Sequence, residues 1–267
     1  MSGTLYLVGT PIGNLKDITY RAVETLGAVD IIASEDTRHT RILLDHYGIK
    51  KPLISYHMHK EREGTEEIID ILMQDKSVAL VSDAGMPCIS DPGAILVAEI
   101  HKRGLDVKVV PGATAVASAV ALSGASTGGF TFVGFLPEKL KDKKAIVENL
   151  KTIAMPLVFY SAPHDLEKTI SFLFDALGDR KLWAVKEITK MFETVYIGSL
   201  SNINIANMRG EFVLIVDGAN VTKDEIDIKS ELQILLDNGS SKSQAVKDIA
   251  KKYGIAKNKV YEVSLEL

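Results

Sequence analysis

Acidic and basic residues stand together in the segment SEDTRHTR, residues 34–41. Glu35 and Asp36 directly follow the apolar run IIA, and Arg38 comes two residues later. Carboxylates beside a cation suit the removal of a proton from a substrate that also carries negative charge. The same residues suit an N-capped helix with local ion pairs, in which Thr37 would cap the helix. From these residues alone, both interpretations stay open.

A second mixed cluster occurs in KEITKMFE, where Lys186, Glu187, Lys190 and Glu193 lie close together in the chain. It also follows an apolar run, KLWAV. It therefore offers the same acid–base chemistry as the first cluster, and the sequence does not choose between them.

Glycine, proline and polar residues are concentrated where four other apolar runs end. These segments are GTPIGN (9–14), SYHMHKER (55–62), SDAGMPCISDPG (82–93) and PGATA (111–115). In open α/β sheets, ligands bind outside the carboxyl ends of the strands. Glycine lets the backbone approach a ligand closely, and proline fixes the shape of a loop. The segments therefore predict a binding site for a compact ligand held largely by main-chain atoms.

Several other kinds of site are disfavoured. No segment has the glycine spacing of a dinucleotide fingerprint or a phosphate-binding loop. The conceivable zinc ligands are His39, His46, His57, His59 and Glu61, but none has the helical spacing of a zinc motif. Cys88 has no activating base nearby in the sequence, so we expect a packed thiol rather than a nucleophile. The pattern therefore predicts a site without a metal.

The composition is that of an ordinary soluble protein. The 267 residues are 46% hydrophobic and 25% charged, and the net charge is −4. One cysteine excludes an internal disulfide, and no apolar run is long enough to cross a membrane. The first residues lack the pattern of a signal peptide, so we expect a cytoplasmic protein.

The chain predicts two α/β domains and a helical tail. In the first part, apolar runs alternate with helical segments, which indicates a mostly parallel sheet covered on both faces. After residue 129, five strand-like runs are separated by only two good helices, so that part of a mixed sheet must pair antiparallel. We therefore expect domains at residues 1–115 and 116–222, followed by a tail at 223–267.

The tail contains the pattern helix, turn at Gly254, helix, which is typical of a helix-turn-helix. Between Lys242 and Lys259 it holds six lysines against one aspartate. Two interpretations remain open: a nucleic-acid contact, or a small helical cap with a solvated basic face.

The segments together resemble one protein family. They are VGTPIGNLKDIT, SEDTRHT, SDAGMPCISDPG, PGATA followed by GFLPEK, and EITKMFE followed by GEFVLIV. They are similar to motifs of the bacterial ribosomal RNA small-subunit methyltransferase I family, within the tetrapyrrole-methylase (class III) group of S-adenosylmethionine enzymes. The resemblance extends over essentially the whole chain, and it implies a homodimer whose two α/β domains enclose a cleft.

The resemblance implies that S-adenosylmethionine lies folded in this cleft and is held mainly by the backbone. The residues that would contact it are Pro11, Asp83, Ala84, Gly85, Met86, Pro87, Pro111, Gly112, Ala113, Thr114, Ala115, Tyr160, Val185 and Phe212. It also implies the reaction, a methyl transfer to the ribose 2′-oxygen of a cytidine in the decoding region of small-subunit rRNA. The substrate would be this RNA or the small ribosomal subunit.

Methyl transfer of this kind requires that the donor methyl and the ribose hydroxyl are aligned, and that a base takes up the hydroxyl proton. It does not require a metal. The candidate catalytic residues are Glu35, Asp36 and Arg38 in one segment, and Lys186, Glu187 and Lys190 in the other. We favour the first segment as the source of the base, and we expect Arg38 to bind the adjacent phosphate of the RNA. Arg41, the run KLKDKK (139–144) and the basic tail are the expected RNA contacts, despite the negative net charge.

The sequence departs from the family at residues 161–165. SAPHD stands there, where the family usually has Glu-Ser-Pro-His-Arg, which puts a catalytic role of this segment in doubt. Two other functions stay as alternatives. One is a small-molecule methyltransferase acting on a tetrapyrrole, and the other is a non-enzymatic DNA-binding sensor.

Overall fold

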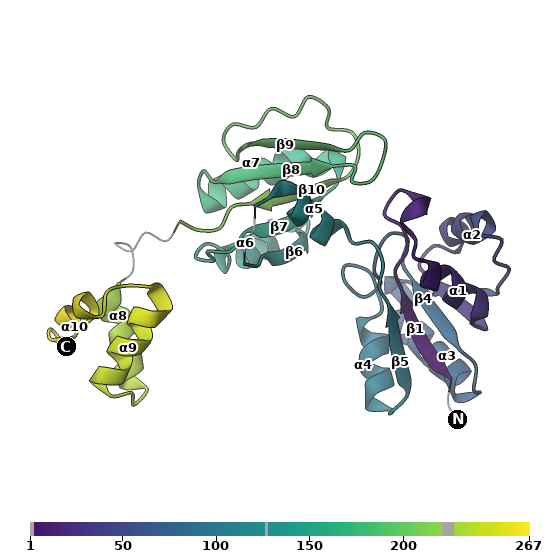
Figure 1. Cartoon of the computed structure of the whole chain (residues 1–267), viewed down its shortest axis with the longest axis horizontal. Coiled ribbons are helices and arrows are strands. Elements are labelled where there is room, and N and C mark those ends of the chain that lie inside the picture. Colours follow the sequence, from purple (N-terminus) through teal and green to yellow (C-terminus); the bar gives the residue numbers. More distant parts are fainter. Residues whose placement is uncertain (1–2, 126–127, 221–226) are drawn as a thin grey trace. The chain divides into compact units, whose positions relative to one another are not determined.

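The computed structural model describes residues 3–125, 128–220 and 227–267. They form two compact units, and Figure 1 shows the path of the chain through them. The first unit contains both sheets, and the second contains the last three helices with the short segment Thr152–Ala154. Within the described ranges, no helix has the length and apolar character needed to cross a membrane. The predicted division of the first unit at residue 115 stays a prediction.

The first sheet is fully parallel, whereas the sequence predicts a mostly parallel one. Its strands are β1 (Thr4–Val8), β2 (Ile31–Ser34), β3 (Leu53–Ser55), β4 (Val78–Val81) and β5 (Asp106–Val110), in the order β3-β2-β4-β1-β5. All four residues of β4 are buried, as expected for a central strand covered on both faces. The carboxyl ends of the strands therefore meet at one edge.

Helices cover both faces of this sheet. They are α1 (Tyr20–Ala28), α2 (Thr37–His46), α3 (Glu61–Met73) and α4 (Ala94–Lys102), with short 3₁₀ turns at Leu15–Asp17 and Met58–Lys60. Leu26 of α1 and Leu44 of α2 pack with Ile32 on one face. Ile68 of α3 and Leu96 of α4 pack with Leu5 on the other.

The second sheet is mixed, as predicted. Its strands are β6 (Thr131–Phe135), β7 (Leu157–Ser161), β8 (Lys181–Lys186), β9 (Thr194–Ser199) and β10 (Phe212–Val216), in the order β6-β7-β10-β8-β9. The β6–β7 pair is parallel, and the β8–β9 pair, which has no helix between its strands, is antiparallel. The register of β6 shifts between Phe132 and Gly134, where Gly134 has a φ of 75°.

The helices of the second sheet are α5 (Ala115–Ser123), α6 (Leu140–Glu148) and α7 (Leu166–Leu177), with a 3₁₀ turn at Pro163–Asp165. Ala119 of α5 packs against Trp183 and Val213 on one face. Residues on the opposite face of β7, β8 and β10 are also buried. Figure 1 shows α7 lying along this sheet.

The tail folds around its own apolar core. It contains α8 (Ile228–Asp237), α9 (Lys242–Tyr253) and α10 (Lys257–Ser264). Leu232, Val246 and Val260, one from each helix, are fully buried together. Gly254 ends α9 in the left-handed conformation with a φ of 60°, which confirms the predicted turn.

Candidate functional site

The loops that follow β1, β4 and β5 interlock at the carboxyl edge of the first sheet. A Cβ atom on Gly9 would lie 2.7 Å from the Gly112 Cα and 2.7 Å from the Met86 sulfur. The Thr10 N–H donates to the Gly85 carbonyl oxygen at 2.9 Å. Glycine is required at Gly9 and Gly112 because the two backbones touch. The loops therefore form one preset surface of main-chain groups.

The structure places most of the predicted donor contacts on this surface. Pro11 follows β1, residues 83–87 follow β4, and residues 111–114 follow β5. Thr114 caps α5 by accepting a hydrogen bond from the Ala117 N–H at 3.2 Å, and Ala115 is the first residue of that helix. Three segments far apart in the sequence are thus brought to one edge.

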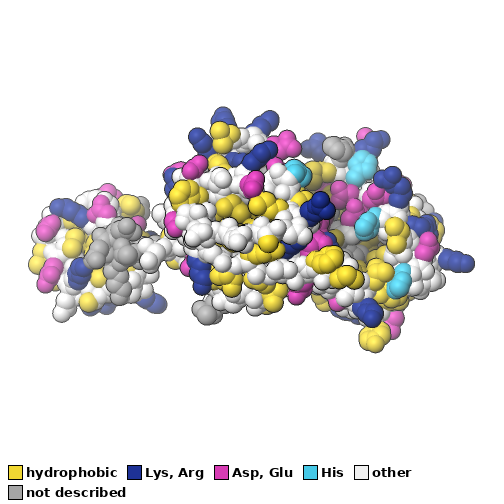
Figure 2. Space-filling view, turned by 90° about the horizontal axis from the view of Figure 1, so that it is seen from above, with side chains coloured by type: hydrophobic (Ala, Val, Ile, Leu, Met, Phe, Trp, Pro, Cys, Tyr) yellow, Lys and Arg dark blue, Asp and Glu magenta, His cyan; other side chains and the backbone are white. Residues whose placement is uncertain are grey.

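Carboxylates gather beside this surface. Asp83 accepts a hydrogen bond from the Asp36 N–H at 3.2 Å, which joins the loop after β4 to the loop after β2. Burial raises the pKa of Glu35, and the carboxylates of Asp91 and Asp83 raise it further, while His57 acts in the opposite direction. Figure 2, seen from above the view of Figure 1, shows acidic and histidine side chains together in this region.

Asp91 belongs to this group, although nothing in its sequence context distinguishes it as a site residue. Burial raises its pKa, a hydrogen bond to Ser82 lowers it, and Asp83 raises it. Glu35, Asp83 and Asp91 therefore form a concentrated negative site, which we call the acidic triplet. Such a site attracts a cation and keeps a carboxylate basic.

Asp36 has a structural role. Its side chain accepts hydrogen bonds from the Arg38 N–H at 2.8 Å and from the Arg38 guanidinium at 2.8 Å, so it caps α2. These bonds hold the pKa of Asp36 well below its usual range. The expectation that Thr37 caps this helix was wrong, because Thr37 is already its first residue. A carboxylate this acidic is a poor proton acceptor.

Tyr160, on β7 of the second sheet, lies near the loop that follows β4. Burial raises the pKa of Tyr160, a bond to the Val116 backbone lowers it, and the Asp91 carboxylate raises it. The Tyr160 ring packs edge-on against Phe135, with centroids 5.3 Å apart. A Cβ on Gly134 would lie 3.7 Å from the Ser90 hydroxyl oxygen, so β6 also approaches the loop after β4.

The other two predicted contacts on the second sheet lie on different faces. Val185 packs with Tyr160 on the face covered by α5. Phe212 pairs with Lys186 and Ser161, and alternation along the strands puts these three on the opposite face. Phe212 is fully buried there, so only its backbone could reach a ligand that touches Tyr160.

The second charged cluster is already neutralised. The Lys190 ammonium lies 2.9 Å from a carboxylate oxygen of Glu187 and 2.9 Å from one of Glu211. Burial raises the pKa of Glu187, but hydrogen bonds from the Glu211 backbone and Lys190 lower it overall. Burial lowers the pKa of Lys190, and the two carboxylates raise it overall. Neither group is suited to take up a proton near neutral pH. Lys186, the third candidate here, is buried at the end of β8.

In the described part of the chain, no group of three or more His, Cys, Asp or Glu residues is arranged so that it could hold a metal ion. His57 lies just beyond β3, at the start of the turn Met58–Lys60, and not on a strand.

We expect Cys88 to react slowly with thiol reagents. Burial, with the Glu61 and Asp91 carboxylates, raises the pKa of the Cys88 thiol to about 11, from an ordinary value of 9.0. At pH 8 the thiolate fraction should therefore be about a hundredfold lower than in the unfolded chain. The rate at which Cys88 reacts with Ellman's reagent, compared with and without guanidinium, measures this difference. Equal rates in the two conditions would contradict the burial argument.

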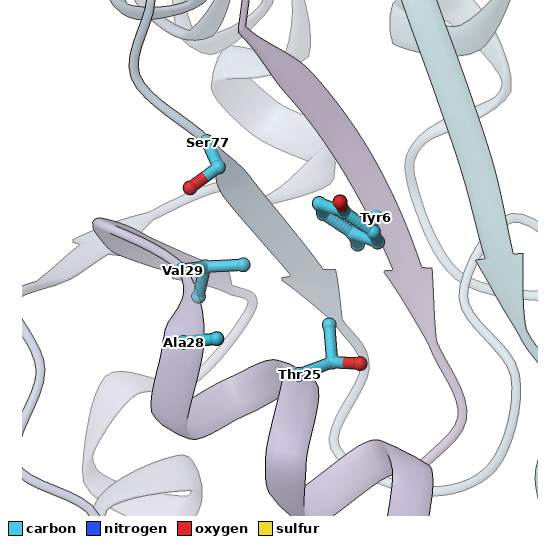
Figure 3. A pocket seen from close by; sticks show the side chains of 5 residues that line it. All are labelled: Tyr6, Thr25, Ala28, Val29 and Ser77. Carbon is cyan, nitrogen blue, oxygen red and sulfur yellow. The ribbon is translucent and has the colours of Figure 1, made fainter.

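A small pocket lies at the amino-terminal end of the first sheet (Figure 3). It is lined by Tyr6, Thr25, Ala28, Val29 and Ser77, and its volume is about 140 Å³. Ligand pockets usually measure roughly 300–1,000 Å³. The pocket is therefore too small for a nucleoside-sized ligand, and it lies at the opposite end of the strands from the interlocked loops.

Comparison with known proteins agrees with this geometry. Residues 4–204 match the family model for Tetrapyrrole (Corrin/Porphyrin) Methylases. A solved structure, a conserved hypothetical protein from Aeropyrum pernix K1, superposes with a TM-score of 0.65 at 18% identity, covering 95% of this chain and 98% of that one. The fold and the site thus define a tetrapyrrole methylase.

Curated relatives narrow the assignment. The ribosomal RNA small subunit methyltransferase I of Bacillus subtilis is 40% identical, over 97% of this chain and 93% of the relative. The protein of the same name from a Synechocystis species is 41% identical, over 99% of this chain and 98% of the relative. The chain belongs to the ribosomal RNA small subunit methyltransferase I family, as the sequence motifs predict.

Proposed function

We propose that this protein transfers a methyl group from S-adenosylmethionine to the ribose 2′-oxygen of a cytidine in the decoding region of small-subunit ribosomal RNA. The observation that carries this proposal is the acidic triplet at the carboxyl edge of the first sheet, next to the interlocked loops. The names of the curated relatives support an rRNA substrate. The resemblance further leads us to propose a cytoplasmic homodimer.

The residues present fit S-adenosylmethionine. The donor carries a positive sulfonium and a positive ammonium, and the acidic triplet supplies the opposite charge. Loops fixed by the Gly9–Gly112 contact offer main-chain N–H and C=O groups to polar atoms of a ligand. Tyr160, with Phe135 beside it, offers an apolar aromatic wall. When bound, this group supplies a methyl attached to a good leaving group.

Among the candidate carboxylates, Glu35 is the one whose electrostatic surroundings favour the role of base. Asp36 is held by Arg38, and Glu187 is held by Lys190, so both carboxylates are more acidic than usual. The pKa of Glu35 is instead raised by burial and by its acidic neighbours. Its carboxylate would accept the proton of the ribose hydroxyl, whose oxygen then attacks the methyl group in line.

Alkaline hydrolysis tests the proposed product. Small ribosomal subunits lacking the modification are incubated with the protein and methyl-labelled S-adenosylmethionine, and the rRNA is then hydrolysed with alkali. A 2′-O-methyl group blocks cleavage at its own nucleotide, so we expect label in an alkali-resistant dinucleotide. Label in single nucleotides would indicate base methylation. Donor binding without any label would favour a small-molecule substrate or a sensor.

The basic tail is proposed as an RNA contact. Lys247 and Lys251 lie exposed on α9, four residues apart, and neither makes an ion pair within the described ranges. Lys229 is also exposed, but it is paired with Glu266 at 3.4 Å. Free lysines on one helical face can bind consecutive phosphates.

We expect Lys247→Ala combined with Lys251→Ala to weaken binding of small ribosomal subunits. The slope of log K against log salt should fall by about 1 for each phosphate that the variant no longer binds. Filter binding at several salt concentrations measures this slope. Lys229→Ala is the matched control and should leave it unchanged. If the double variant keeps the wild-type slope, the tail is a helical cap without an RNA role.

A further inference from the structure

The turn between β8 and β9 exposes two large apolar side chains. Met191 is 91% exposed and Phe192 is 68% exposed. Exposed apolar side chains on an ordered segment often mark a binding surface. We propose that Phe192 is a stacking platform for an unpaired base of the RNA substrate, close to the ribose that receives the methyl group. This inference rests on the proposed function.

The turn is held in one shape by its own hydrogen bonds. The Thr189 N–H donates to the Glu193 carboxylate at 2.6 Å, and the Thr194 hydroxyl donates to the Phe192 carbonyl oxygen at 3.1 Å. Glu187 and Thr189 both have positive φ angles, 51° and 65°, although neither is glycine. Such strain persists only where the surroundings fix the backbone, and it is concentrated at functional sites. Phe192 is therefore presented on a preset support.

This turn is fastened to the loop that follows β1. The Thr189 hydroxyl donates a hydrogen bond to the Asp17 carboxylate. The Lys190 side chain crosses Gly13 so closely that a Cβ there would lie 2.6 Å from the Lys190 Cε. Phe192 is two residues beyond Lys190, a span of at most about 7 Å of chain. Phe192 therefore lies close to the loop that follows β1, and we expect the acceptor nucleotide to arrive on this side.

The chemistry around Phe192 favours an RNA base over an apolar protein partner. Arg209 is exposed and has no ion pair within the described residues, and its neighbour Gly210 packs against the Glu187 carboxylate. Glu187 thus links the segment that carries Arg209 to the turn that carries Phe192. An exposed aromatic ring and an exposed guanidinium on two such linked segments suit a base together with its phosphate. Sequence-specific RNA recognition relies on unpaired bases that stack on aromatic side chains.

The test compares Phe192→Leu, which keeps apolar bulk but removes the π face, with Phe192→Trp, which keeps an aromatic ring. Full-length variants are titrated with single-stranded oligoribonucleotides covering the methylated region, intact or with one abasic position, and with small ribosomal subunits. We expect Phe192→Leu to weaken binding by roughly tenfold to a hundredfold. It should raise KM and leave kcat at saturation close to wild type. Phe192→Trp should bind like the wild type.

Two readouts separate stacking from a structural effect. One abasic position should weaken the wild type but not Phe192→Leu. The indole introduced by Phe192→Trp should be quenched by RNA, while the native Trp183, which is 6% exposed, gives the unquenched background. Wild-type affinity in Phe192→Leu would overturn the proposal. A change of oligomeric state in light scattering would overturn it too, and would assign the side chain to a contact with a second copy. Failure of the wild type to methylate subunits is a separate result, against the proposed function.

Discussion

Replacing Glu35 with glutamine is expected to slow methyl transfer by about 10²- to 10⁴-fold, the usual loss when a positioned base is removed. Glutamine keeps the shape of the side chain but cannot accept the hydroxyl proton. Because Asp83 and Asp91 keep two of the three negative charges of the acidic triplet, donor affinity should fall much less than the rate. Single-turnover methylation with labelled donor measures the rate, and calorimetry measures donor binding.

The dependence of the methylation rate on pH gives a second test of Glu35 as the base. A base acts only when deprotonated, so the rate should fall as pH falls through the pKa of Glu35. That pKa is raised above its ordinary value of 4.5, so the loss should begin at higher pH than for an exposed glutamate. Glu35→Gln should abolish this dependence.

Asp36→Asn is the matched control, because asparagine also caps a helix well and Asp36 is engaged by Arg38. Its rate should stay close to wild type. If Glu35→Gln kept the wild-type rate and the wild-type pH dependence, a residue other than Glu35 would be the base.

The second large effect is expected from Gly112→Ala. The new Cβ would lie 2.9 Å from the Cα, carbonyl carbon and carbonyl oxygen of Gly9, and backbone atoms cannot move aside cheaply. We expect the free energy of unfolding to fall by about 1–3 kcal/mol, as in other overpacked sites. Because this substitution would displace the loops that we propose hold the donor, methyl transfer should fall by about a hundredfold. Thermal unfolding and single-turnover methylation measure the two effects.

Gly27→Ala serves as the control for this substitution. Gly27 lies in α1, and a Cβ there would meet nothing within 4 Å. Because alanine favours helix, this variant should gain roughly 0.5–1 kcal/mol of stability and keep its activity. A Gly112→Ala protein as stable and active as Gly27→Ala would show that the loops are not tightly locked.

The fold was predictable because local patterns agree with the global arrangement. The continuous apolar run at β4 indicated a strand buried on both faces, and β4 is the central strand of the parallel sheet. The missing helix between β8 and β9 predicted their antiparallel pairing. The helix α8 was predicted only as an undivided part of the helical tail at residues 223–267.

The loops that form the candidate site could be predicted from the sequence, but the chemical role of each residue in them could not. Glu35 and Asp36 are adjacent in the sequence, so the sequence assigns them the same role. In the structure their surroundings differ: burial and Asp91 raise the pKa of Glu35, whereas Arg38 lowers the pKa of Asp36. Asp91 was overlooked although it lies in the quoted loop, since only the fold brings it near Tyr160. Strand register, which the sequence does not give, puts Phe212 and Val185 on opposite faces.

The strand order of the first sheet also has a consequence for how the protein is made. Leu5 in β1 pairs with Val78 on one side and Val107 on the other, so β1 finds no partner until much of the chain has left the ribosome. Sheets closed by such distant contacts fold slowly, and helical bundles with local contacts fold fast. We therefore expect β1, which is made before both of its partner strands, to be among the last segments to become protected from hydrogen exchange. The tail, whose three helices share a core of local contacts, should acquire its protection much faster.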